Sequence, residues 1–225
     1  YADAFRRDVS SRLASDLRQN AVLFFFAANN FRLKGLRELI LAFAAAIGYV
    51  NREPLIEKAG RFMAPTGDYT ADIAILEGAD YICTGFIKTG MDLLSAGKVK
   101  KIIVVIHRIA PAHRPFGING DYPDAVSRQL REAGLKEEQF KIIVSPIRNP
   151  VTLKEAQFVM KDLAGNSIKD AILIAPSFHT RRSYLCYAYI GEPLRVKIYP
   201  VAAFTEHQQN KWWEDEKGWR NFSME

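Results

Sequence analysis

From residue 72 to residue 201, short apolar runs rich in β-branched residues alternate with amphipathic stretches of helical length. The apolar runs predict strands at 72–76, 101–106, 141–145, 171–175 and 195–201. The stretches between them predict helices at 85–97, 122–134, 152–164 and from Phe178 onward. Continuous apolar strands separated by helices of about 10–15 residues are typical of a parallel sheet that is covered on both faces. The pattern therefore predicts a doubly wound α/β fold with a mostly parallel sheet.

In a doubly wound sheet, ligands bind beyond the carboxyl ends of the parallel strands. The residues that follow the predicted strands are Glu77, Gly78 and Asp80; His107 and Arg108; Ser145, Arg148 and Asn149; Ser177, His179, Arg181 and Arg182; and Thr205, Glu206 and His207. Three of the chain's four histidines belong to this set. A single histidine near a loop is more often structural than catalytic, but three histidines at one edge favour a ligand site there.

The stretch SFHTRRSYL, residues 177–185, places a histidine and two arginines in the first turn of a predicted helix. The positive end of the helix dipole disfavours cations at this turn by roughly 0.3–1 kcal/mol each. An anion bound at the turn would accept hydrogen bonds from free N–H groups and from both guanidinium groups. The alternative is that Arg181 and Arg182 reach into water or pair with surface carboxylates. The positions of the histidines favour the anion site.

The charge balance also favours anionic partners, because the chain has a net charge of +6 and an isoelectric point near 9.3. Its basic residues are dispersed and no aromatic RNA-binding motif is present, so we do not expect nucleic acid as a partner. The two cysteines, Cys83 and Cys186, fit neither a zinc site nor a disulfide framework. The segment LEGADYICTG has too few glycines for a dinucleotide phosphate turn, which argues against NAD. The sequence does not identify a cofactor.

The N-terminal part has a different character, because residues 39–50, LILAFAAAIGYV, form an apolar run that follows Arg32, Lys34 and Arg37. A run of this length suits a core helix, a signal-type segment or a membrane anchor. If it inserts, the preceding positive charges place the α/β domain outside the cytoplasm. We therefore divide the chain into an N-terminal helical segment, residues 1–65, and an α/β domain, residues 66–225.

Four segments of the chain resemble, in order and spacing, the YdcF/SanA/ElyC-like family of bacterial envelope proteins: ADIAILEGAD, LLSAGKVKKIIVV, NPVTLKEA and AILIAPSFHTRRS. The resemblance covers about residues 71–201 and implies a Rossmann-like fold, an N-terminal anchor in the bacterial inner membrane and a role in the cell envelope. One branch of the family is associated with S-adenosylmethionine. Residue by residue, the resemblance implies ligand contacts at Gly78, Thr152, Glu155, Ser177, His179 and Arg182.

The sequence departs from the family pattern after the second strand, where His107 and Arg108 replace a small Ser-Gly turn. This departure adds both residues to the candidate ligand contacts and indicates an altered substrate. Thr152 and Glu155 also have the spacing of a helix capping box, which is a purely structural interpretation.

These observations lead to one main hypothesis about function. The chain would bind, and could process, a phosphorylated or otherwise anionic metabolite or a lipid-linked sugar at the envelope. His179 would be the general acid or base, Arg181 and Arg182 would bind the anion, and Glu77 or Asp80 would orient the ligand. The alternatives are a non-catalytic binding module for a nucleotide or S-adenosylmethionine, and a structural partner in an envelope complex. The sequence does not decide whether the chain is an enzyme.

Overall fold

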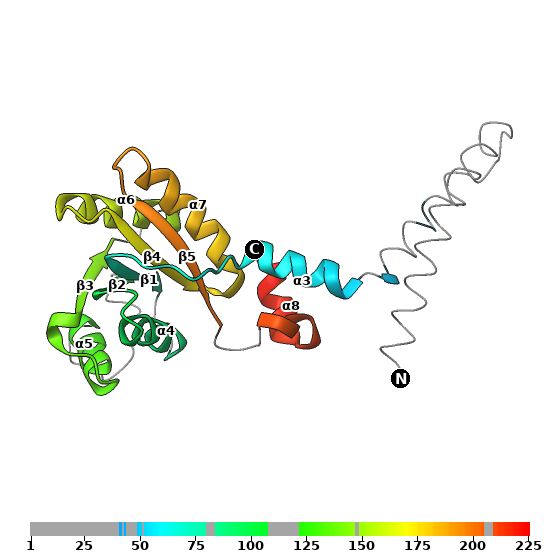
Figure 1. The fold of residues 1–225 in the computed structure, drawn as a ribbon, viewed down its shortest axis with the longest axis horizontal. Helices are drawn as coiled ribbons and strands as arrows, with labels where there is room; N and C mark the ends of the chain where they lie inside the picture. The colour runs from blue at the N-terminus through cyan, green and yellow to red at the C-terminus, as the bar shows by residue number, and fades with distance from the viewer. Residues whose placement is uncertain are drawn as a thin grey trace, which may run out of the picture. The chain divides into compact units, whose positions relative to one another are not determined.

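The computed structural model describes residues 41, 43, 49–50, 52–79, 84–107, 122–146, 149–204 and 209–225. Its centre is a five-stranded parallel sheet in the order β3-β2-β1-β4-β5 (Figure 1). The strands are β1 (Ile73–Ala79), β2 (Lys101–His107), β3 (Phe140–Ser145), β4 (Asp170–Pro176) and β5 (Lys197–Ala203). The predicted doubly wound α/β fold is confirmed.

Helices cover both faces of the sheet (Figure 1). They are α4 (Thr84–Ser95) and α5 (Tyr122–Glu132) on one face, and α6 (Val151–Gly165) and α7 (Thr180–Gly191) on the other. Strand residues alternate between the two cores, so that Ala74 and Leu76 pack toward α4 and α5 while Ile73 and Ile75 pack toward α6 and α7. Two apolar layers therefore fix the register of the sheet.

The strand order reverses between β1 and β4, because the chain continues from β1 toward β2 and β3 and later returns to β4 and β5 on the other side. In open α/β sheets, the crevice outside the carboxyl ends of the strands at such a switch point is the usual ligand site. The residues that end β1 and follow β4 lie beside this point, and they include Glu77 and His179.

A β-bulge interrupts β1 at this edge. Leu76 pairs with Val104 and Ala79 pairs with Ile106, so β1 contains one more residue than β2 between these two pairs. Bulges often re-aim side chains next to active sites. Here the extra residue lies at Glu77–Gly78, and Gly78 packs closely against Glu155 of α6.

The turn after β4 is a short 3-10 helix, η3 (Ser177–His179), which continues directly into α7. The helix predicted to begin at Phe178 thus starts as a tighter turn, with His179 as the N-cap residue of α7. Ser177 has a φ of 43°, which is uncommon for a residue with a side chain. This turn positions the polar groups of His179, Arg182 and Ser183.

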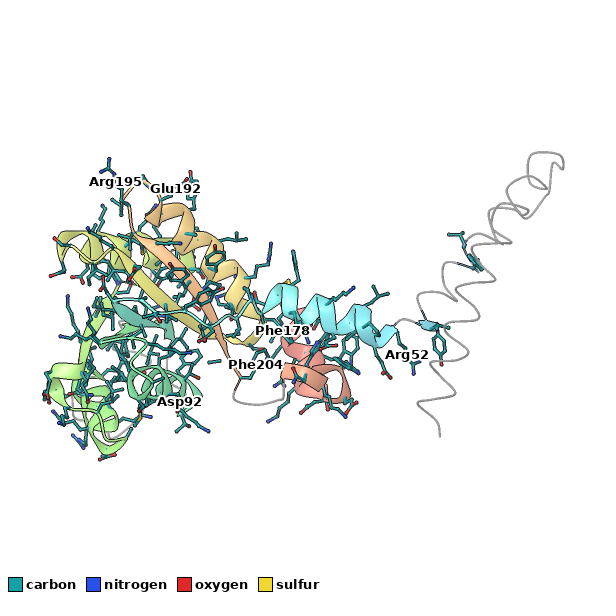
Figure 2. The ribbon with its side chains drawn as sticks, viewed as in Figure 1. Arg52, Asp92, Phe178, Glu192, Arg195 and Phe204 are labelled. Atoms are coloured by element: carbon teal, nitrogen blue, oxygen red, sulfur yellow. The ribbon has the colours of Figure 1, made fainter. Side chains whose placement is uncertain are left out.

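A third apolar cluster, besides the two cores beside the sheet, packs the turn after β4 against the C-terminal part of the chain. It contains residues of α3 (Arg52–Met63), η4 (Gln209–Glu214) and α8 (Glu216–Ser223). Phe178 makes edge contacts with Phe204, Trp212 and Phe222, at ring-centroid distances of 5.8, 5.1 and 5.2 Å. Figure 2 shows Phe178 and Phe204 near α8, whereas Glu192 and Arg195 lie at the other end of α7. The C-terminal residues therefore pack against the turn that carries His179.

The chain separates into two compact units, Tyr1–Glu53 and Pro54–Glu225. The domain boundary at residues 65 and 66 stays a prediction. Of the apolar run 39–50, only Leu41, Phe43, Tyr49 and Val50 are among the described residues, so the predicted anchor falls largely outside them. Within the described ranges, no helix combines the length and the apolar character that crossing a bilayer requires.

Candidate functional site

The first part of the site is a buried hydrogen-bonded group formed by Ser183, Glu77 and His179. Glu77 ends the stripe of β1 that faces α6 and α7, and it is only 5% exposed. Its Oε1 accepts a hydrogen bond of 2.5 Å from Ser183 Oγ and lies 3.4 Å from His179 Nε2. A buried carboxylate beside an imidazole fixes the orientation and protonation of the ring. Glu77 therefore directs Nε2 of His179 inward.

The pKa values of this pair are both raised. Burial raises the pKa of Glu77, and its contacts with His179 and Ser183 only partly oppose that effect. Burial by itself would lower the pKa of His179, but the hydrogen bond and charge of Glu77, together with the charge of Glu225, outweigh it. A raised histidine pKa means that the ring holds its proton to a higher pH than a free imidazole does. His179 can therefore act as a proton donor over a wider pH range than a free imidazole.

The outer nitrogen of His179 contacts an anion and a cation. Its Nδ1 lies 2.9 Å from Glu225 Oε1 and 2.6 Å from Arg182 Nη2. One nitrogen cannot donate to the carboxylate and accept from the guanidinium at the same time. Because a carboxylate lies against each ring nitrogen, Glu77 at Nε2 and Glu225 at Nδ1, we assign the charged ring, which donates Nδ1–H to Glu225. Arg182 Nη2 also lies 3.4 Å from Glu225 Oε2, so His179 and Arg182 together bind a carboxylate.

The second part of the site has a similar arrangement, with Tyr187 in the place of the serine, Glu155 as the carboxylate and His107 as the imidazole. Glu155 is 2% exposed, and its Oε1 accepts hydrogen bonds from Tyr187 Oη at 2.6 Å and from the Gly78 backbone N–H at 3.1 Å. Its Oε2 lies 2.6 Å from His107 Nε2. Burial, with the nearby charge of Glu155, raises the pKa of Tyr187 well above its usual range, so the phenol remains a donor. His107 follows Ile103 and Val105 on the stripe of β2 that faces α6 and α7.

The predicted capping box of α6 is wrong. The N-cap residue is Pro150, no side chain caps the helix, and Thr152 lies within the first turn. Glu155 turns toward the sheet edge, where three donors surround it, and does not reach back to the helix start.

The structure brings some of the sequence-predicted residues together and not others. Glu77, Gly78, His107, Glu155, His179 and Arg182 form the two groups described above. Arg181 lies apart, because its guanidinium stacks 3.6 Å from the Phe62 ring centroid and donates to the Phe62 carbonyl at 3.3 Å. Ser177 forms the turn, and its carbonyl accepts from Thr180 Oγ1 at 2.6 Å. Asp80 and Arg108 lie outside the described residues.

Three residues of the site were not predicted from the sequence: Ser183, Tyr187 and Glu225. Ser183 and Tyr187 follow His179 at spacings of four and eight residues, so all three share one face of a helix. Once His179 was a candidate, this spacing could have identified Ser183 and Tyr187 as further site residues. Glu225 is separated from His179 by 46 positions in the sequence, and only the aromatic packing of the C-terminal segment brings it close.

Two buried polar atoms of this region have no hydrogen-bond partner within the described part of the chain. They are Glu77 Oε2 and Ser145 Oγ. Ser145 pairs with His107 in the sheet register and is fully buried. Buried polar atoms normally have a partner, so both atoms indicate places where a ligand atom or a water can bind. Among the described residues, no three or more His, Cys, Asp or Glu side chains form a group that could hold a metal ion.

Comparison with known proteins adds no family assignment: no family model matches the chain, and no curated protein is significantly similar to it in sequence.

Proposed function

We propose that the chain binds a phosphate-bearing or similarly anionic ligand at the switch point, and that His179 transfers a proton to or from it. The observation that carries the proposal is the carboxylate of Glu225, which His179 Nδ1 and Arg182 Nη2 hold at 2.9 and 3.4 Å. Charge-assisted contacts of this kind are the usual means of binding carboxylate and phosphate groups. A ligand anion would take the position of the Glu225 carboxylate.

The proton transfer follows from the way in which the ring is held. Glu77 directs Nε2 inward, which leaves Nδ1 as the nitrogen that faces the anion. In the charged ring, Nδ1 donates to the ligand, and after transfer the neutral ring accepts a hydrogen bond from Arg182, which lies 2.6 Å from Nδ1. General acid–base catalysis by a positioned histidine typically contributes about 10²–10⁴-fold to a rate.

The resemblance to the YdcF/SanA/ElyC-like family supports a more specific proposal about setting and ligand. Gly78, Glu155, His179 and Arg182, which match its motifs, lie within the two hydrogen-bonded groups of the site. We therefore propose membership of this family, an anchor in residues 39–50 and a phosphorylated metabolite or a lipid-linked sugar of the cell envelope as the ligand.

A phosphate titration of the full chain tests the proposal. Histidine side chains labelled with ¹⁵N report inorganic phosphate binding, and we expect saturable shifts of the His179 signals. Arg182→Ala should weaken binding by about 10–100-fold, because a hydrogen bond to a charged group contributes about 1.5–3 kcal/mol. It should change the free energy of unfolding by no more than about 1 kcal/mol, because Arg182 is 56% exposed and its ion pair is screened by solvent.

Arg181→Ala is the matched control, because the neighbouring arginine stacks on Phe62 and does not contact His179. Its phosphate affinity should remain within about threefold of that of the unmodified chain. Unchanged affinity in Arg182→Ala would contradict the proposal. The same titration should include S-adenosylmethionine and a nucleoside triphosphate, because the strand order also suits proteins that bind nucleotides. Binding of these ligands but not of phosphate would favour the non-catalytic alternative.

A further inference from the structure

We infer that residues 222–225, at the end of α8, form a cap that closes the anion site and that a bound phosphate displaces, which rests on the proposed function and adds regulation to the same site. Glu225 fills the anion position, and Phe222 packs on the turn that carries His179. The closed cap therefore competes with the ligand through two side chains of different chemistry.

With the cap closed, the chain itself occupies the anion position. Glu225 Oε1 lies 2.9 Å from His179 Nδ1, and Glu225 Oε2 lies 3.4 Å from Arg182 Nη2. The side chain of His179 is 17% exposed and that of Glu225 is 13% exposed, so solvent hardly reaches the contact between them. A phosphate cannot reach Nδ1 until Glu225 has moved away. Closure of the cap and binding of the ligand therefore exclude each other.

The attachment of the cap is weak. Its backbone hydrogen bonds, from Met224 N–H to the Arg220 carbonyl at 3.2 Å and from Glu225 N–H to the Phe222 carbonyl at 3.4 Å, exceed the usual length of about 2.9–3.0 Å. The ion pair with Arg182 is screened, because that guanidinium is half-exposed. α8 has eight residues, a length at which an isolated helix is marginal. Such a segment can open at a free energy well below that of global unfolding.

Phe222 determines how firmly the cap closes. Its ring stacks on Trp212 at a centroid distance of 4.4 Å and meets Phe178 edge-on at 5.2 Å. Trp212 is buried in the third apolar cluster, whereas Phe222 is only partly buried against that cluster. Trp212 therefore stays in place when the cap opens, and opening removes the ring that covers it. Its indole reports the state of the cap.

Acrylamide quenching of tryptophan fluorescence tests the cap in the unmodified full chain. The three tryptophans of the chain, Trp212, Trp213 and Trp219, all lie in η4 and α8. Inorganic phosphate should increase the quenching along the same saturation curve as the ¹⁵N shifts of His179. Sodium chloride at equal ionic strength should not increase it.

A change of one carboxylate should open the cap without a ligand. Glu225→Gln should show increased quenching before phosphate is added and a smaller further increase with phosphate, because the ion pairs that close the cap are lost. Glu214→Gln is the matched control, since its carboxylate pairs with Lys211 at 3.5 Å in the neighbouring η4. This control should be quenched as the unmodified chain is.

Phe222→Ala tests the part of the cap that carries no charge. This variant should bind phosphate about 2–10-fold more tightly than the unmodified chain, because loss of one aromatic pair shifts the cap toward its open state by a factor of this size. A merely structural role of Phe222 predicts lower stability with unchanged affinity. Tyr189→Ala is the matched control, since Tyr189 is exposed near the far end of α7, and it should leave the affinity unchanged.

The outcomes separate the cap from the proposed function. Saturable shifts of the His179 signals with unchanged quenching would overturn the cap and leave the proposed function intact. Unchanged or weaker phosphate binding by Phe222→Ala would also overturn the cap. If phosphate changes neither the His179 signals nor the quenching, the proposed function fails and the cap fails with it.

Discussion

Gly78→Ala should be a strongly destabilising substitution, although it adds only one methyl group. A Cβ atom at this position would lie 2.8 Å from His107 Nε2 and 2.9 Å from Glu155 Cδ, both closer than ordinary van der Waals contact. Glu155 cannot withdraw without losing its hydrogen bonds to Tyr187, His107 and the Gly78 N–H. The substitution therefore strains the core or breaks a buried ion pair.

The magnitude lies between two limits. Overpacking of a well-packed core costs about 1–3 kcal/mol, and disruption of a buried ion pair costs about 3–5 kcal/mol. We expect a loss of about 3 kcal/mol in the free energy of unfolding. For a unit of the size of Pro54–Glu225, this corresponds to a fall in Tm of roughly 6–12 °C.

Urea and thermal unfolding of the full chain measure this loss. Gly165→Ala is the matched control, because a Cβ atom there meets nothing within 4 Å and α6 ends at this residue; we expect no loss of stability. In a Glu155→Ala background, Gly78→Ala should cost less than in the unmodified chain. A Gly78→Ala protein within about 0.5 kcal/mol of the unmodified chain would refute the packing of Glu155 and His107 against the bulge.

Four further outcomes are expected. The pKa of His179 is higher in the folded state than its usual value of 6.5. The stability that His179 contributes is therefore complete below pH 6.5 and is lost as the pH rises through the raised pKa. Urea unfolding from about pH 6 to pH 9 should show this loss, and the His179→Gln variant should not show it. Glu77→Gln should lower the pKa of His179 in an NMR titration, because the carboxylate is what raises it, and an unchanged value would contradict the pairing. Glu225→Gln should bind phosphate about two- to fivefold more tightly by removal of a competing carboxylate, and weaker binding would count against the competition. The full chain should partition with bacterial membranes if residues 39–50 are an anchor, and recovery in the soluble cell fraction without detergent would show that they are not.

The fold could be predicted closely because each strand is a continuous apolar run. The run 101–106 corresponds to β2, Lys101–His107, and 171–175 to β4, Asp170–Pro176. Local patterns do not specify strand order or register irregularities, so neither the switch point nor the bulge in β1 could be located in advance. The packing of Trp212 and Phe222 on Phe178 was also unpredictable, since it depends on contacts between distant segments.

The site was predictable where a residue ends a strand. Glu77 and His107 continue the inward-facing positions of β1 and β2, and the α/β rule places them at the ligand edge.

The position of the two arginines in a first turn was not enough to predict which of them belongs to the site. Successive residues of a helix point about 100° apart, so Arg181 and Arg182 could not both face His179, and Arg181 stacks on Phe62. The phase of α7 relative to the sheet, which decides between them, is set by tertiary packing.

The four-residue interval between Ser183 and Tyr187 restricts how this chain can diverge in length. Both hydroxyls reach their carboxylates because they lie on one side of α7. One residue inserted between them would rotate the following part of the helix by about 100° and advance it by about 1.5 Å. The same helix could then no longer donate hydrogen bonds to both Glu77 and Glu155. Homologues that share this chemistry should therefore vary in length in the turn after Gly191 or elsewhere outside this interval, and never between these two positions.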